Sequence, residues 1–255
     1  MNFHSDAWIQ TQLETHFSYA QTIVPLKQIV GIFVYGSQNY GLDTCSSDID
    51  TKVVVAPSME DVVLNRRPIS TVKILPNGEH VEFKDIRLVM DMFRKCSPNW
   101  VEILFTRYKI INPLYTHLWD ILCVKKNEIA YYNPNRALRV MASMSRNEWN
   151  KIQDEYNNKS AALVLRLRQL VFSYLTYDKY TLELSYPRAE TVKEVKLGRM
   201  SEAAVMQEAK KAFEMTQSLV NYYLEANEEK EDETTQAFMN NMQARFCKKG
   251  LQTDD

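Results

Sequence analysis

The segment YGSQNYGLDTCSSDID occupies residues 35–50 and lies between two β-rich parts of the chain. QIVGIFVYG, residues 28–36, leads into it as a short apolar run that ends in glycine, and DIDTKVVVA, residues 48–56, leads out of it as a second such run. Short apolar runs rich in β-branched residues and bounded by turn residues are typical of buried strands. We therefore predict two core strands, with a turn at Gly36 and two acids at the far end of the connection.

Asp48 and Asp50 are separated by one residue at the start of the second predicted strand. Because side chains alternate along a strand, both carboxylates point to one face while Ile49 points to the other. Two neighbouring carboxylates repel each other unless a cation lies between them, and oxygen-only ligands select a hard ion such as Mg²⁺ or Mn²⁺. The pattern therefore predicts a divalent metal site, and pairs of such ions serve many enzymes that transfer phosphoryl or nucleotidyl groups.

A third acid is expected on a neighbouring strand. Residues 70–86, STVKILPNGEHVEFKDI, form two β-rich runs around an Asn-Gly pair, which supplies the positive φ angles that a tight hairpin turn needs. Glu82 lies between Val81 and Phe83, so alternation directs its carboxylate to the face opposite these apolar side chains. Asp85 is the alternative, but it has the other parity and lies nearer the following helix, and we prefer Glu82.

Gly36 and Ser37 are predicted to contact phosphate. A glycine directly after a buried strand lets the backbone turn tightly and lets a phosphate approach closely. Ser37 can donate its hydroxyl and its backbone N–H, and a short helix starting there would add further N–H groups. An isolated Gly-Ser is usually a turn. The specificity of the pattern lies in its order: strand, Gly-Ser, a fixed gap, Asp-x-Asp, and then an acid between apolar residues in the next hairpin.

The remaining pattern predicts an α/β-type first half and an all-helical second half, an α+β chain overall. Helices are expected over residues 5–22 and 86–96, and another after CSPNW, where Ser97 or Asn99 caps the helix and Glu102 completes a capping box with Asn99. After residue 114 the β signals disappear and long helices follow. We predict a domain over 1–115 that carries the acids, a helical domain over 116–227, and a charged tail with a terminal helix over 228–255.

Composition limits the classes of function. The 255 residues carry a net charge of −1, which offers no global attraction to nucleic acid or anionic membrane. Four scattered cysteines without a C-x-x-C pair argue against a zinc site or a disulfide framework, and favour free thiols in a reducing compartment. The N-terminus does not resemble a signal peptide, and no run approaches the roughly 20 apolar residues of a membrane span. We expect a cytoplasmic protein that does not enter the membrane.

Together these residues resemble the nucleotidyltransferase superfamily typified by DNA polymerase beta, whose signature is an apolar residue followed by Gly-Ser, a loop, Asp-x-Asp and a later third carboxylate. The form GSxxYGLxTxxSDxD is similar to stand-alone predicted nucleotidyltransferases of bacteria and phages. Three later segments resemble theirs as well: CSPNWVEILF, NKSAALVLRLRQL and VKEVKLGRMSEAAV. The resemblance covers about residues 28–225, and Ser97 departs from it because many relatives have Asn there.

The resemblance implies a mixed β-sheet core with flanking helices, followed by a helical domain that closes over a nucleotide. Gly36 and Ser37 would hold the triphosphate. The catalytic and Mg²⁺-binding or Mn²⁺-binding residues would be the three predicted acids, Asp48, Asp50 and Glu82. Of these, Glu82 would also be the general base for the incoming hydroxyl.

Two cations of the helical half are expected at the nucleotide. Lys159 and Arg166 are seven residues apart, so they lie on one face of a predicted helix. The resemblance favours a role in nucleotide binding, and the alternative is a solvated helix face with ordinary ion pairs.

The implied reaction is Mg²⁺-dependent transfer of a nucleoside monophosphate from an NTP, with ATP expected, to a hydroxyl group with release of pyrophosphate. The slightly negative charge and the absence of a basic run favour a small-molecule or protein acceptor, with RNA as an alternative. Two other functions stay open: a non-enzymatic antitoxin or regulatory partner on the same fold, and a tRNA-directed or oligonucleotide-directed transferase or cyclic-oligonucleotide synthase. The sequence does not define the oligomeric state.

Overall fold

A five-stranded mixed sheet forms the N-terminal part of the protein, whose computed structural model describes residues 3–177, 180–182, 184 and 188–252. The strand order is β3-β4-β2-β1-β5. β1 pairs antiparallel with β2 and β5, β3 pairs antiparallel with β4, and β2 and β4 are parallel. The bounds are β1 Ile29–Tyr35, β2 Asp50–Val55, β3 Ser70–Ile74, β4 His80–Asp85 and β5 Lys109–Ile111. This arrangement confirms the predicted α+β class and mixed sheet.

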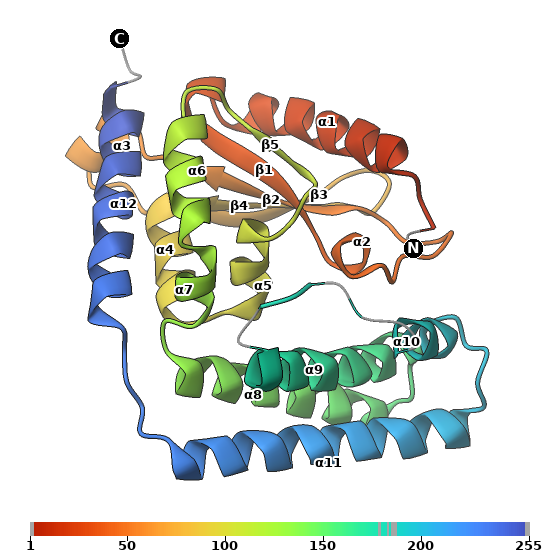
Figure 1. The fold of residues 1–255 in the computed structure, drawn as a ribbon. Helices are drawn as coiled ribbons and strands as arrows, with labels where there is room; N and C mark the ends of the chain where they lie inside the picture. The colour runs from red at the N-terminus through yellow and green to blue at the C-terminus, as the bar shows by residue number, and fades with distance from the viewer. Residues whose placement is uncertain (1–2, 178–179, 183, 185–187, 253–255) are drawn as a thin grey trace.

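Alternation along β2 gives the sheet two different faces. Val53 and Val55 point to the face covered by α1 (Asp6–Ile23), which contributes Ile9 and Leu13 to the same buried cluster. Val54 points the other way, into the larger cluster that includes α4 (Ile86–Arg94) and α6 (Thr116–Val124). Figure 1 shows α1 along one side of the sheet, with α4 and α6 on the other. Asp50 and Lys52 share this second face with Val54. Along β2 the face therefore changes from charged residues at the start of the strand to apolar residues at its end.

The connection from β1 to β2 turns sharply at both ends of a very short helix, α2 (Ser37–Tyr40). Gly36 precedes α2 with φ of 92°, and Gly41 ends it in the left-handed region with φ of 68°. Positive φ values cost L-residues energy and are readily adopted by glycine. The two glycines therefore explain how the chain leaves the sheet, forms one turn of helix and starts back toward β2.

Most of the remaining elements are helices, as predicted. In the first half these are α3 (Met59–Val63), α5 (Pro98–Val101) and the 3-10 turns η1 (Leu26–Gln28) and η2 (Glu102–Leu104). The second half contains α7 (Lys126–Ala130), α8 (Pro134–Asp154), α9 (Asn158–Tyr177), α10 (Arg188–Lys196), α11 (Glu202–Ala226) and α12 (Glu233–Leu251). α8 and α11 both pack against α9, and Trp149 stacks on Phe213 with ring centroids 5.5 Å apart.

The last helix returns to the sheet part of the molecule. α12 packs against α4 and α6, and Figure 1 shows it running from the end of α11 back along α6. Its buried Phe246 lies 6.5 Å from Trp119 and 6.3 Å from Tyr115, measured between ring centroids. In the acidic connection, Glu229 pairs with both Arg136 and Arg139 of α8. The predicted domain boundaries stay predictions, while the predicted terminal helix is part of a shared core.

The packing of α12 leads to a stability prediction. Phe246→Ala removes a fully buried ring between α4 and α6, and we expect it to lower the free energy of unfolding by about 3–5 kcal/mol. Lys248→Ala on the exposed side of the same helix should change it by less than about 0.5 kcal/mol. Urea denaturation followed by circular dichroism measures both. Equal stability of the two variants would contradict a core role for α12.

Candidate active site

The predicted acids lie at one end of the sheet. Asp50 opens β2 opposite Tyr35 of β1, and Glu82 lies in β4 opposite Lys52 of β2. Burial raises the pKa of the Tyr35 phenol, and four nearby carboxylates raise it further, in the order Asp50, Glu82, Glu102 and Asp48. The charges of Asp48, Asp50 and Glu82 thus all act on one phenol, together with that of Glu102, an acid that was not predicted for the site.

Each of two acids is held by a basic partner from β4. Asp50 Oδ1 accepts the backbone N–H of His80 at 2.9 Å and lies 2.9 Å from His80 Nδ1. Glu82 lies 3.2 Å from Lys84 Nζ, whereas Asp48 is exposed. Across the described ranges, no three His, Cys, Asp or Glu side chains lie close enough together to hold one metal ion.

The donor chemistry of these acids still fits a hard divalent ion, because carboxylate oxygens are the ligands that Mg²⁺ and Mn²⁺ prefer. Their present positions do not converge on one point. An ion would have to compete with His80 for Asp50 and with Lys84 for Glu82.

Asp85, the alternative third acid, lies at the opposite end of β4. Its side chain caps α4 by accepting the Arg87 N–H at 2.8 Å and forms two further contacts with the Arg87 guanidinium at 2.9 and 2.7 Å. In the parallel register Asp85 is opposite Val55, at the far end of β2 from Asp50. It is therefore a structural cap away from the other acids.

The Gly36-Ser37 turn has open space above it. A Cβ atom placed on Gly36 would meet nothing within 4 Å, and the φ of this residue is strongly positive. The turn is also tied to the acids, because Gln38 donates from Nε2 to the backbone oxygen of Asp48 at 2.6 Å. Ser37 Oγ lies 3.4 Å from Gln38 Oε1. A group bound at this turn would therefore lie next to the segment that carries Asp48.

Glu102 is the acid that sequence analysis assigned to a different role. It is 1% exposed, accepts the backbone N–H of Gly36 at 3.3 Å and accepts the hydroxyl of Tyr40. The capping-box interpretation is wrong: Ser97 is the N-cap of α5, and Glu102 opens η2 with its side chain directed toward the Gly36 turn. The sequence indicated a functional role for Glu102 only through its place in CSPNWVEILF, one of the segments on which the family resemblance was based.

Lys52 is a buried cation on the same face. It is 1% exposed, its Nζ lies 4.0 Å from Glu102 Oε1, and it lies over the Tyr35 ring at 4.0 Å from the centroid. Burial lowers the pKa of Lys52, while the carboxylates of Glu102 and Glu82 act against that shift. Strand alternation places it on the face of Asp50, so the DIDTK pattern contained the signal.

Two cations of the helical half, Arg166 and Lys196, contact this region. The Arg166 guanidinium is buried and lies 3.2 Å from the centroid of the Tyr40 ring. Lys196 of α10 donates to the Leu42 backbone oxygen at 2.9 Å. Burial lowers the pKa of Lys196, and the charge of Lys159, an exposed residue, lowers it further. Lys196 belongs to the VKEVKLG segment but was not singled out from the sequence.

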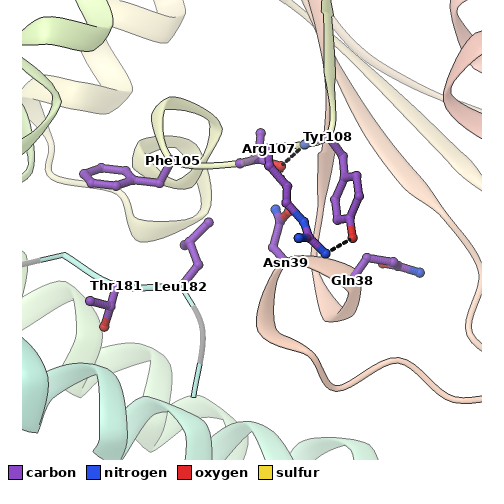
Figure 2. Close-up of a pocket in the computed structure, with 8 residues that line it drawn as sticks. Gln38, Asn39, Phe105, Arg107, Tyr108, Thr181 and Leu182 are labelled. Carbon is purple, nitrogen blue, oxygen red and sulfur yellow. Dashed lines mark hydrogen bonds between the residues drawn. The ribbon is translucent and has the colours of Figure 1, made fainter. Parts of the chain in front are cut away.

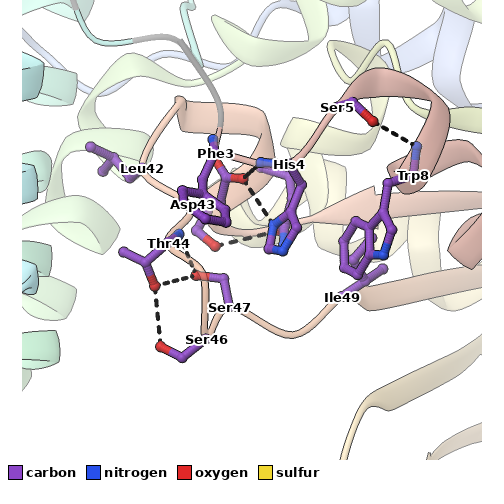
Figure 3. A network of polar contacts seen from close by, with 12 residues as sticks. Phe3, His4, Ser5, Trp8, Leu42, Asp43, Thr44, Ser46, Ser47 and Ile49 are labelled. Atoms are coloured by element: carbon purple, nitrogen blue, oxygen red, sulfur yellow. Dashed lines mark hydrogen bonds and ion pairs between the residues drawn. The ribbon is translucent and has the colours of Figure 1, made fainter.

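A polar network holds the loop between α2 and Asp48. Buried Asp43 accepts the backbone N–H groups of Phe3 at 3.0 Å and His4 at 2.8 Å (Figure 3). Thr44 N–H donates to Ser47 Oγ at 2.9 Å, and Lys196 reaches the same oxygen at 3.2 Å. The N-terminal segment and α10 therefore hold this loop from two sides.

A cavity of about 270 Å³ lies beside α2, which contributes Gln38 and Asn39 to its lining. Gln38, Phe105 and Leu182 are among its lining residues, and Figure 2 shows that they come from three separate parts of the chain. Arg107 at its wall donates to the Tyr108 hydroxyl at 2.5 Å. The mixed apolar and polar lining makes it a place where part of a bound substrate could extend from the Gly36 turn.

Comparisons with known proteins add little. No family model and no curated protein matches the chain. Among solved structures, a nucleotidyltransferase-like protein from Exiguobacterium sibiricum is 11% identical, with 84% of this chain and 75% of that chain covered and a TM-score of 0.33. A likeness this distant supports no inference about fold or function. No helix in the described part of the chain is long and apolar enough to cross a membrane.

The buried pair of Lys52 and Glu102 leads to a double-mutant prediction. Glu102→Gln leaves Lys52 Nζ buried without its carboxylate partner, and we expect a loss of about 3–5 kcal/mol in the free energy of unfolding. Combining it with Lys52→Met should cost less than the sum of the single changes, with a coupling of about 2 kcal/mol. Urea denaturation of the four proteins measures the coupling.

The exposed pair Lys125–Glu128, at 3.0 Å, is the matched control. Its coupling in the same type of cycle should be about 0.5 kcal/mol, because solvent screens an exposed pair. Additive effects at Lys52 and Glu102 would show that the two charges do not stabilise each other.

Proposed function

We propose that this protein is a Mg²⁺-dependent nucleotidyltransferase, able to use Mn²⁺ instead, that transfers a nucleoside monophosphate from an NTP, with ATP expected, to a hydroxyl group and releases pyrophosphate. The observation that carries the proposal is the placement of Asp50 opposite Tyr35, one residue before the Gly36 turn, with Glu82 on the same face of the adjacent strand and the Asp48 backbone bonded to Gln38 of that turn. The resemblance of the Gly-Ser, Asp-x-Asp and third-acid pattern to the polymerase beta superfamily supports the same reaction.

The triphosphate is assigned to the open space at Gly36 and Ser37. A phosphate can approach the backbone closely there because Gly36 has no side chain and nothing else fills the space of a Cβ. Two cations of the helical half lie close by: Arg166 beside Tyr40, and Lys196 beside the loop that precedes Asp48. Lysine and arginine are the side chains that commonly bind phosphate.

The three acids would hold the divalent ions. When bound, such ions neutralise the charge that develops on the transferred phosphoryl group and on the departing pyrophosphate. For this to happen Asp50 must exchange its contact with His80 for an ion, and Glu82 must exchange its contact with Lys84. Lys52, which donates to the Asn99 backbone oxygen and lies 4.0 Å from Glu102 Oε1, would keep a positive charge next to the site.

Glu82 is proposed as the group that accepts the proton of the acceptor hydroxyl. A general base must lie within hydrogen-bonding reach of that proton, and Glu82 is a partly exposed carboxylate on the sheet face that carries Asp50. We propose a small molecule or a protein as the acceptor, because the chain carries a net charge of −1 and no basic run that would attract RNA.

One observation favours the non-enzymatic alternative. Asp50 and Glu82 are already paired with protein groups, and no described trio of ligands converges. A regulatory partner protein on this fold would need the acids only for their place in the structure. In that case a partner should bind equally well to wild type and to a variant that lacks the three acids.

The transfer reaction can be tested by incubating the protein with Mg²⁺, α-³²P-labelled NTPs and candidate hydroxyl acceptors. We expect the combined variant Asp48→Asn, Asp50→Asn and, separately, Glu82→Gln to slow transfer of the label to the acceptor by about 100-fold or more. The reason is that each loses several kcal/mol of stabilisation in the transition state. Addition of EDTA should stop the wild-type reaction.

Asp85→Asn is the matched control for Glu82→Gln, because both acids lie on β4 but Asp85 caps α4 at the far end. It should retain the wild-type rate once the protein is folded. Equal rates for wild type and the Asp48, Asp50 variant with every NTP and acceptor would refute the proposed reaction.

A further inference from the structure

A buried polar cluster lies behind the acids, on the sheet face that α1 covers. It joins His16 of α1, Thr51 of β2 and Glu79, which directly precedes β4. His16 and Thr51 are fully buried and Glu79 is 6% exposed. Nothing in the proposed reaction uses these side chains, since they point away from the face that carries Asp50.

The cluster contacts both neighbours of Asp50. His16 Nδ1 lies 2.9 Å from Thr51 Oγ1, and His16 Nε2 lies 2.9 Å from Glu79 Oε2. The other oxygen of that carboxylate, Glu79 Oε1, accepts the backbone N–H of Ile49 at 3.1 Å. Residues 49 and 51 flank Asp50, so one continuous set of contacts holds the backbone before it, at Ile49, and the side chain after it, at Thr51.

Glu79 is itself fixed by the hairpin turn. Its Oε2 accepts Asn77 Nδ2 at 2.6 Å, and its backbone N–H donates to Asn77 Oδ1 at 3.2 Å. Burial raises the pKa of Glu79, but the hydrogen bonds from His16, Ile49 and Asn77 outweigh that effect and lower it. The ionised carboxylate is the form that accepts all of these contacts.

The next residue along the chain acts on the opposite face. Consecutive strand residues point to opposite sides, and His80 holds the Asp50 carboxylate through its backbone N–H and Nδ1. Glu79 and His80 therefore contact residues 49–51 from opposite faces of the sheet. Burying a histidine and a glutamate costs free energy unless both are hydrogen-bonded. Here the hydrogen bonds that offset this cost include one from Ile49 to Glu79 and one between His16 and Thr51, so the stability of the cluster depends on the two residues beside Asp50.

We propose that His16 and Glu79 are positioning residues for the acid pair. They set the backbone over residues 49–51, which joins Asp48 to Asp50 at the start of β2, and ion binding by those acids depends on this arrangement. The inference rests on the proposed function for the role of the two aspartates, while the arrangement of the backbone can be measured without it.

The test uses the full chain and two substitutions at Glu79. Glu79→Leu removes both carboxylate oxygens, whereas Glu79→Gln keeps an amide oxygen that can accept the Ile49 N–H. Asp85→Leu is the matched control, because it replaces another buried acid at the opposite end of β4. Two quantities are measured: the hydrogen-exchange rate of the Ile49 amide by NMR, and Mn²⁺ affinity from the EPR signal of the free ion.

We expect Glu79→Leu to speed exchange of the Ile49 amide and to weaken Mn²⁺ binding by about 10- to 100-fold, the usual effect of removing a group that orients metal ligands. Glu79→Gln should restore most of the affinity. Asp85→Leu should lose stability without losing affinity. Thr51→Val, which removes only the hydroxyl that contacts His16, gives a milder second variant if Glu79→Leu does not fold, and it should weaken Mn²⁺ binding in the same direction.

The possible failures are distinct. If wild type binds Mn²⁺ no better than the variant with Asp48→Asn and Asp50→Asn, the proposed function fails and this inference fails with it. If wild type binds Mn²⁺ through those aspartates, but Glu79→Leu and Thr51→Val bind it as tightly as wild type, the positioning role alone is overturned. Equal loss of affinity in Asp85→Leu would also overturn it, because the effect would then follow stability rather than position.

Discussion

The electrostatic problem at one end of the sheet shapes the rest of the structure. Four carboxylates act electrostatically on Tyr35, and two of them, Asp50 and Glu82, are on adjacent parallel strands. Like charges on one face of a sheet raise the free energy of the folded state unless cations offset them. The protein supplies Lys52 beneath the acids, and Lys84 and His80 beside them. Asp50 and Glu82 are therefore each balanced by a group of the protein itself.

The helical half is tied to this end of the sheet through one continuous set of contacts. Arg166 lies over Tyr40, the Tyr40 hydroxyl donates to Glu102, and Glu102 accepts the Gly36 N–H and pairs with Lys52. All residues in this set of contacts are buried except Gly36. In a buried network the loss of one group leaves its partners unsatisfied, so the network resists piecemeal change. The Gly36 turn, the acids and the helices therefore adopt their positions together.

Much of the fold was predictable because its determinants are local. Ser5 caps α1, Asn-Gly forms the β3–β4 turn, and the β-rich runs became β1, β2 and β4. Within the candidate site, alternation correctly placed Asp50 and Glu82 on one face of the sheet, but β2 begins at Asp50 and leaves Asp48 outside the strand in which it was predicted. Glu102 was assigned to a capping box because local spacing cannot show that its side chain crosses to Gly36, 66 positions away in the sequence. Lys196 was missed for the same reason, since its partners lie in a loop 149 or more residues earlier.

The sequence by itself determined which residues share a face and where the chain turns, because strand periodicity and the φ preference of glycine act within a few residues. It thereby placed Asp50 and Glu82 on one face of the sheet, whereas Asp48 precedes β2 and its place on that face stays a prediction. Only the tertiary structure decided which cations balance those acids, that His16 and Glu79 hold the backbone behind them, and that α12 completes the core beside the sheet. These contacts join residues far apart in the chain, so they depend on how the sheet and helices pack rather than on any local pattern.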